Sequence, residues 1–311
     1  MEFEVIVNDS YIRLFAGSDL SPSHNKYVLG LINDFEDGQW RYQKFQEYIW
    51  DNIAETALSY EERSNLVGNP LSVLRRAAKN LRLIDQESKK KIGEGSELAE
   101  ILLYGIMRDH YKALPVVPKI FYKQNSQDTV KGSDSVHVVI SDDKSDFTLW
   151  FGEAKFLSDI SDSRLDVVVD SVMDSLKSDK LKKENSIISS VGSLRSLVSG
   201  ESLYERISKS LSNKASIDTI KSKINIPILL LHNCSITSEQ SEISDEYIEN
   251  IRKFYLGRAE SYFKKQVKKI SSEIFKYSEV KFHLILFPVP DKEKVVNQFV
   301  KNVVHFKGDC E

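Results

Sequence analysis

A helical segment followed by three short apolar segments limits the possible folds of this chain more than any other feature of its sequence. Apolar residues recur at helical spacing from Leu98 to Ile106, and the pattern stops before Pro115. A polar turn, SDDKSD, separates the last two of the apolar segments, which are residues 116–122, 136–140 and 147–156. This order predicts a helix followed by a three-stranded meander.

The rest of the chain alternates between helix and strand patterns. Apolar residues show helical spacing at residues 164–183 and 245–275, and they form short runs typical of buried strands at residues 224–232 and 280–287. The serine-rich residues 186–223 keep leucines and isoleucines at intervals, so we interpret them as a helical insertion. Together these patterns predict an α/β fold of mixed α+β character, in which helices flank a central mixed β-sheet.

The first third of the chain is predicted to be mostly helical. Residues 3–8 and 11–15 look like two short strands around a polar turn, which indicates an initial β-hairpin. From Phe45 onward, apolar residues recur every fourth position, as on one face of a helix. We divide the chain into this N-terminal region, residues 1–90, and a larger domain, residues 91–311, that carries the insertion.

The charge balance and the cysteine content exclude several classes of protein. The 43 Lys and Arg against 46 Asp and Glu give a net charge of -3, which excludes a strongly basic nucleic-acid coat. The longest apolar run, residues 226–231, falls short of the roughly 18–20 residues of a membrane-spanning helix. Cys234 and Cys310 are too few for a disulfide framework and lie in no Cys-x-x-Cys pattern. We therefore expect a cytoplasmic protein with no part in the membrane.

One stretch of the sequence carries residues suited to catalysis. Asp134 and Glu153 lie on adjacent predicted strands, which can bring two carboxylates together at one end of a sheet. Lys155, two residues after Glu153, must point to the same face of its strand. Glu97 adds a further acid on the helix before the strands. We therefore expect these acids and one amine to converge.

These groups suit the hydrolysis of a phosphodiester. Carboxylates alone would repel the phosphate, but with Mg²⁺, or Mn²⁺ in its place, Asp134 and Glu153 become a metal site that clamps the phosphate and acidifies a bound water. Glu97 would bind the ion or a water on it. The Lys155 ammonium would orient the nucleophile and stabilise the charge that develops on the phosphate. These four residues are our candidate catalytic residues, and the three acids are the candidate metal ligands.

The Glu-x-Lys pattern alone is weak evidence, because the chain contains it twice more, at Glu87-Ser88-Lys89 and Glu279-Val280-Lys281. A related pattern, Asp142-Asp143-Lys144, falls in a predicted turn. Glu153 differs from these because it follows a strongly apolar strand and has both a strand-borne acid and an acid-bearing helix before it. This context favours Glu153 and Lys155 as the functional pair.

The Ser133-Asp134 acid, the Glu153-Ala154-Lys155 triplet and the acid on the leading helix resemble the PD-(D/E)xK nuclease superfamily. Its restriction-endonuclease-like core is a helix, a three-stranded meander, a helix and a further strand. More narrowly, the chain resembles the HamA family, the nuclease subunits of Hachiman anti-phage defence systems. The stretches that carry this narrower likeness are GEGSELAEILLY, KGSD, LWFGEAK and IPILLLHNC.

The resemblance implies a DNA-degrading effector that works with HamB, an ATP-dependent superfamily 2 helicase. It also implies that Asp134 and Glu153 bind metal, that Lys155 is the catalytic lysine and that Glu97 is the helix acid. Glu94 and Glu100 lie three residues to either side of Glu97, on nearly the same helical face. The sequence therefore leaves open which of these three acids has the role.

Several histidines and cysteines are better explained by packing than by chemistry. His137 points away from the face of Asp134 by strand alternation, and His110 is isolated, so we take neither as a base. Three further residues lie in or beside apolar strands without the spacing of zinc ligands, and we expect them to be buried: His232, Cys234 and His283.

Lysines form a cationic stripe on the helix predicted after residue 245, opposite its apolar face. The stripe consists of Lys264, Lys265, Lys268 and Lys269. It is explained either as the solvated side of an amphipathic helix or as a surface that contacts DNA phosphates or the helicase. A second group of lysines, between residues 177 and 183, allows the same two interpretations. The acidic pI near 6.1 suggests weak DNA binding alone, and therefore a partner that delivers DNA.

Two other functions remain compatible with the sequence. The chain could be a catalytically silent member of the nuclease fold that serves as a helicase partner or as a scaffold binding DNA ends. It could also be a restriction-type nuclease that selects its own sequence, which would give ordered fragments on a gel where an unselective nuclease gives smears.

Overall fold

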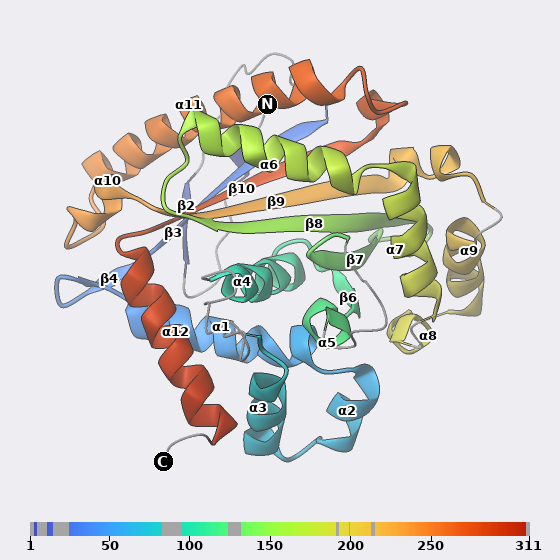
Figure 1. The fold of residues 1–311 in the computed structure, drawn as a ribbon, viewed down its shortest axis with the longest axis horizontal. Coiled ribbons are helices and arrows are strands. Elements are labelled where there is room, and N and C mark those ends of the chain that lie inside the picture. The colour runs from blue at the N-terminus through green and yellow to red at the C-terminus, as the bar shows by residue number, and fades with distance from the viewer. Residues whose placement is uncertain are drawn as a thin grey trace.

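An eight-stranded β-sheet forms the centre of the fold (Figure 1). The computed structural model describes residues 25–82, 95–123, 132–190, 193–198, 200–212 and 215–308, and the two short strands β1 and β2 before them. The strand order is β1-β3-β10-β9-β8-β7-β6, and β2 pairs with β3. The strands are β1 (Phe3–Glu4), β2 (Tyr11–Leu14), β3 (Lys26–Asn33), β6 (Leu114–Val117), β7 (Ser135–Ile140), β8 (Phe147–Leu157), β9 (Ile224–Asn233) and β10 (Lys281–Val289). A separate small hairpin joins β4 (Phe35–Glu36) to β5 (Gln39–Trp40).

The sheet is mixed, as predicted. Strands β3, β10, β9 and β8 run parallel to one another, whereas β8, β7 and β6 form an antiparallel meander. The helix before this meander is α4 (Ser96–Asp109). The sequence pattern of a helix followed by three strands is therefore confirmed, except that the first apolar segment, predicted as a strand to residue 122, ends at Val117 as β6 and continues as the short helix α5 (Lys119–Lys123).

Helices cover both faces of the sheet, which explains why its central strands are apolar throughout. Nine of the ten residues of β9 are buried, because neither face of this strand meets water. On one face lie α6 (Asp162–Ser175) and α11 (Asp245–Ile270), shown above the sheet in Figure 1. On the other face lie α1 (Tyr42–Ala57), α4 and α12 (Lys292–Lys307), with α3 (Pro70–Lys79) packed outside them.

The connection from β8 to β9 is helical, as the serine-rich segment predicts. After α6 it contains α7 (Ser178–Ser190), α8 (Ser193–Leu197) and α9 (Glu201–Leu211), which lie at the side of the sheet that carries β6 and β7 (Figure 1). Its leucines and isoleucines, such as Leu194 and Ile207, are buried in the same core as the α6 face. The connection is therefore part of the packed protein and not a flexible linker.

The predicted N-terminal hairpin is wrong. Strands β1 and β2 do not pair with each other in the described residues; β1 pairs in parallel, and β2 antiparallel, with β3. Strand β3 itself was not predicted, although its sequence, KYVLGLIN, is a continuous apolar run of strand length. It pairs with β10, so the N-terminal region contributes a strand to the central sheet.

The described fold also contains two short α-helices, α2 (Tyr60–Asn65) between α1 and α3 and α10 (Ser235–Ser238) after β9. Three 3-10 helices complete it: η1 (Ile217–Thr219), η2 (Lys221–Lys223) and η3 (Tyr277–Glu279). None of the helices in the described part of the chain combines the length and the apolar character that a membrane crossing requires.

Candidate active site

Asp134, the residue just before β7, lies opposite Glu153 of β8. Ser135 is paired with Gly152 in the antiparallel register, so the next position places Asp134 opposite Glu153. Two hydrogen bonds fix this alignment: the Asp134 N–H donates to the Gly152 carbonyl at 2.8 Å, and the Ala154 N–H donates to the Asp134 carboxylate at 3.1 Å. Side chains of directly opposed residues project from the same face of a sheet. The two acids therefore meet at the end of the strand pair, as the sequence predicts.

Lys155 joins the two carboxylates. Its Nζ lies 2.5 Å from Oε1 of Glu153 and 4.0 Å from Oδ2 of Asp134. The expectation that residues 153 and 155 share a face is therefore confirmed, and one ammonium lies within ion-pair distance of both acids. The Glu153 Oε1 atom also accepts a hydrogen bond from the hydroxyl of Ser171 on α6.

Burial and like charge set the electrostatics of this group. The Glu153 side chain is only 7% exposed, and its burial, followed by the negative charge of Asp134, raises the pKa of its carboxyl against the opposing effect of Lys155. Burial alone would lower the pKa of Lys155, but the carboxylates of Glu153 and Asp134 outweigh it and raise that pKa above its ordinary value. Lys155 is therefore a cation at neutral pH, and Glu153 is an acid that a positive ion would stabilise in its charged form.

A hollow of about 270 Å³ opens beside these residues. It is lined by Ser96, Glu100, Asp134, Ala154, Lys155, Phe156, Leu157 and Lys292. Gly95, the residue before α4, brings the helix start close to β8: its φ is +85°, and a Cβ there would come within 2.5 Å of the Phe156 ring. This close approach is what allows a helix-borne acid to line the hollow.

The helix acid in the hollow is Glu100, and Glu97 points elsewhere. Glu97 accepts two hydrogen bonds from the backbone N–H of Arg82, at 3.0 and 2.9 Å, and it does not line the hollow. Glu100 is buried, lines the hollow and contributes to raising the pKa of Lys155. Glu94 lies outside the described residues. Of the two described acids, the structure therefore brings Glu100, and not Glu97, to the Asp134 side of the helix.

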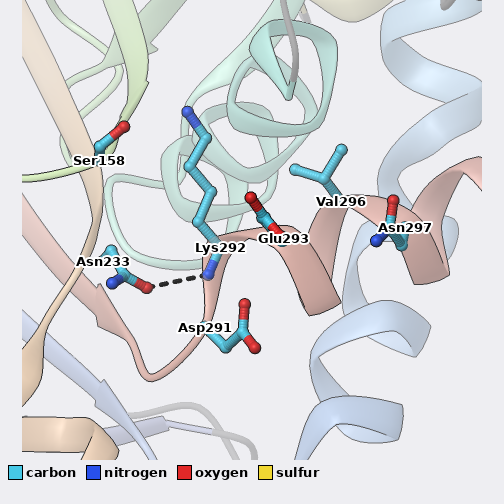
Figure 2. Close-up of a pocket in the computed structure, with 7 residues that line it drawn as sticks. All are labelled: Ser158, Asn233, Asp291, Lys292, Glu293, Val296 and Asn297. Atoms are coloured by element: carbon cyan, nitrogen blue, oxygen red, sulfur yellow. Dashed lines mark hydrogen bonds between the residues drawn. The ribbon is translucent and has the colours of Figure 1, made fainter.

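A second hollow, of about 440 Å³, adjoins the first at the carboxyl ends of the parallel strands (Figure 2). It is lined by Ser158, Asn233, Asp291, Lys292, Glu293, Val296 and Asn297, and thus by the start of α12. Lys292 lines both hollows. Its backbone N–H donates a hydrogen bond to the side chain of Asn233, and its ammonium donates one to the Phe156 carbonyl at 2.8 Å. A lysine therefore connects the two hollows along the sheet edge.

The donor set fits a hard divalent cation with a partly aqueous shell. No three His, Cys, Asp or Glu side chains within the described residues gather as a ready-made metal cluster. Asp134 nevertheless lines the hollow, and the Glu153 carboxylate lies opposite it, bound to the same Lys155 ammonium. Mg²⁺ commonly binds through one or two carboxylates and keeps several waters. The predicted ligands Asp134 and Glu153 fit this pattern, whereas the carboxylate of Glu97, the third predicted ligand, binds the Arg82 backbone and does not line the hollow.

The residues expected to be structural are buried. His137 packs against Tyr104 of α4 with ring centroids 4.5 Å apart, and burial lowers its pKa to about 3. His232 and His283 are also buried, and burial lowers their pKa values to about 4 and about 3. Cys234 is a buried free thiol. Cys310 lies outside the described residues.

Most lysines of the stripe on α11 are paired with acids. Lys265 and Lys269 form ion pairs with Asp166 and Asp170 of α6, and Lys264 pairs with Glu260 on its own helix. Exposed pairs of this kind are weak, but they offset the positive charge that a phosphate would meet. The structure therefore favours the interpretation of this stripe as the outer side of a helix packed against α6.

Two residues of the site were not predicted. Ser171 comes from α6, and no sequence rule connects a serine in a helix to a strand 18 positions earlier. Lys292 follows β10 in the sequence Pro290-Asp291-Lys292 at the start of a helix. That position at a strand's carboxyl end was a usable signal, because ligands in α/β sheets bind beyond the carboxyl ends of the strands.

Comparison with models of protein families shows to which family the chain belongs. The sequence model of the HamA family matches residues 9–303, which is nearly the whole chain. The chain belongs to the HamA family. It is therefore a protein of the Hachiman anti-phage defence type, and the HamA match includes the N-terminal region as well as the site. A comparison with curated proteins found no match.

Proposed function

We propose that this HamA-family chain is the metal-dependent DNA nuclease effector of a Hachiman-type complex. The observation that supports the proposal is the placement of Asp134 opposite Glu153, with the Lys155 ammonium within 4.0 Å of both, beside an open hollow. Two acids and a lysine that converge on one face have no evident purpose in a scaffold. They are the groups required to hold a cation and a phosphodiester together.

Each residue has a distinct part in this proposal. Asp134 and Glu153 would hold Mg²⁺ or Mn²⁺, which when bound would neutralise phosphate charge and lower the pKa of a bound water. Lys155, kept cationic by the two acids, orients the attacking water and stabilises the charge that develops on the phosphate. Ser171 holds the Glu153 carboxylate in place. We take Glu100, in place of Glu97, as the acid that the helix contributes.

The charge of the chain supports the proposal that a partner controls it. With a net charge of -3 and most lysines of the α11 stripe paired, the protein offers little to attract DNA by itself. A HamB-like superfamily 2 helicase that engages DNA and delivers it to the hollow would supply the missing affinity. We therefore propose that the nuclease is inactive until its helicase engages phage or damaged DNA.

The test is plasmid degradation by the chain together with its helicase, Mg²⁺ and ATP. We expect Glu153→Ala or Lys155→Ala to abolish degradation. A matched control is the double variant Glu279→Ala/Lys281→Ala, which removes another Glu-x-Lys pattern, away from the hollow, and should leave degradation unchanged. Undiminished cleavage by either site variant would reject the proposal.

The lack of a ready-made cluster of three metal-ligating side chains among the described residues favours one alternative, a catalytically silent partner of the helicase. In that case the wild-type complex would bind DNA ends but leave the plasmid intact with Mg²⁺ and with Mn²⁺. Degradation that requires Glu153 excludes this alternative.

A further inference from the structure

A buried ion pair contacts the residues just before Asp134, where the chain enters β7. Lys119 of α5 is fully buried, Glu184 of α7 is 2% exposed, and the Lys119 ammonium lies 2.7 and 2.6 Å from the two oxygens of Glu184. Burying two charges is costly, so such a pair persists only where good geometry and further hydrogen bonds compensate the loss of water. The further bond of Glu184 is therefore informative.

That bond connects the ion pair to the active site. The Ser133 N–H donates to Oε1 of Glu184 at 2.8 Å, and Ser133 directly precedes Asp134. Gly132 makes the approach possible, because a Cβ at this position would lie only 1.9 Å from the same carboxylate oxygen. The residues that enter β7 are thus fixed from one side by Glu184 and from the other by the pairing of Asp134 with β8.

We propose that Glu184 is a positioning residue for Asp134, so that helix α7, in the connection from β8 to β9, completes the nuclease site. Glu184 does not line the hollow, and it acts through the peptide that places the Asp134 carboxylate opposite Glu153. The inference rests on the proposed function only where it predicts that a misplaced Asp134 reduces DNA cleavage. The placement of Asp134 can be tested independently of any nuclease activity.

Two double variants separate the hydrogen bond from the ion pair. Lys119→Met/Glu184→Gln removes both buried charges but keeps a side-chain oxygen for the Ser133 N–H. Lys119→Met/Glu184→Leu removes the charges and the acceptor at similar volume. The direct measurement is hydrogen exchange of the Ala154 amide, which donates to Asp134. Mn²⁺ affinity by calorimetry and plasmid degradation with the helicase provide the second and third measurements.

The glutamine variant is expected to keep wild-type exchange at Ala154 and wild-type Mn²⁺ affinity. The leucine variant is expected to show at least tenfold faster exchange at Ala154 and at least tenfold weaker Mn²⁺ binding, with its far-ultraviolet circular dichroism unchanged. Equal behaviour of the two variants, whether both like wild type or both impaired, would overturn the proposal. A wild-type protein without nuclease activity would refute the proposed function and leave the exchange comparison decisive.

Glu184→Asp gives a second test if the leucine variant does not fold. It keeps a carboxylate near Lys119 but shortens the side chain, so the oxygen withdraws from the Ser133 N–H. We expect the same faster exchange at Ala154, and unchanged exchange would count against the proposal. The control is Lys223→Met, which breaks an ion pair with Asp146 at the opposite end of the β7–β8 pair and should leave Ala154 exchange at the wild-type rate.

Discussion

Two lysine–glutamate pairs of almost equal length lie in very different surroundings. The Lys155–Glu153 pair, 2.5 Å long, has a lysine that is 33% exposed and a second carboxylate, Asp134, close by. The Lys119–Glu184 pair, 2.6 Å long, has both side chains sealed from solvent. Distance alone therefore does not tell a functional pair from a structural one.

The surroundings make the difference. In the first pair, Lys155 borders a hollow and lies within ion-pair distance of two carboxylates, which is the arrangement that we propose binds a divalent ion. In the sealed pair, both carboxylate oxygens of Glu184 bind the Lys119 ammonium, and one of them also accepts a hydrogen bond from the Ser133 N–H. We interpret the first pair as the reactive group and the second as its support.

The largest expected effect comes from breaking the sealed pair. Lys119→Met leaves the Glu184 carboxylate buried without its cation, which should cost about 3–5 kcal/mol of unfolding free energy. Lys155→Met should cost clearly less, because its ammonium is partly hydrated and Glu153 can take up a proton. Denaturant unfolding of both variants measures the difference. An equal loss in the two variants would contradict the contrast between the pairs.

The next effect concerns the acid that α4 adds to the exposed pair. Glu100→Gln is expected to slow plasmid degradation on the order of 10²-fold, the scale of losing one electrostatic group of a catalytic site. Glu97→Gln, three residues away on the same helix, should change the rate less than twofold, since its carboxylate binds the Arg82 backbone. The reverse ranking would restore Glu97 as the helix acid.

Glu153 of the Lys155–Glu153 pair should also have an abnormal pKa. In metal-free protein, the carboxyl carbon signal of Glu153 should show a pKa above the ordinary 4.5, and Asp134→Asn should lower it by removing a like charge. Because the folded pKa exceeds the unfolded one, Glu153 favours folding most at acid pH and loses that contribution as the pH rises through the folded pKa. A midpoint at or below 4.5 would contradict this description.

The smallest effect is expected for ion pairs on the surface, which are neither buried nor part of the proposed site. Asp166→Asn removes the partner of Lys265 on the surface between α6 and α11, where an ion pair contributes about 0.2–1 kcal/mol. Thermal unfolding at low and high salt measures it, and the difference from wild type should shrink at high salt. A loss as large as that of Lys119→Met would mean that exposure does not distinguish the pairs.

Local patterns predicted the part of the site that lies on one strand pair. Strand alternation placed Glu153 and Lys155 on one face, and adjacency of the strands brought Asp134 to them. The helix acid could not be chosen from the sequence, because the three glutamates are spaced three residues apart on nearly the same helical face, and tertiary contacts such as that of Glu97 with the Arg82 backbone distinguish them. The sequence therefore limited the helix acid to three glutamates but could not select one of them.

Long-range pairing explains what the sequence missed. Strand β3 lies beside β10, more than 250 positions later, and such pairing leaves no periodic trace in either segment. Without that pairing, the first two strands were assigned to each other as a hairpin. The contact of Glu184 with the site could not be predicted either, because Glu184 lies 51 residues after Ser133, whose N–H donates a hydrogen bond to it. Sequence spacing therefore reveals the proposed catalytic pair, whose residues are close in the chain, more readily than the distant residues that support it.

Calorimetric titration of Mg²⁺ into the purified chain tests the central claim most directly. Wild-type protein should bind the ion, Asp134→Asn/Glu153→Gln should not, and Glu279→Gln should bind it as wild type does. Binding that survives the loss of both opposed carboxylates, or no binding to the wild-type protein, would contradict the assignment of Asp134 and Glu153 as the metal site.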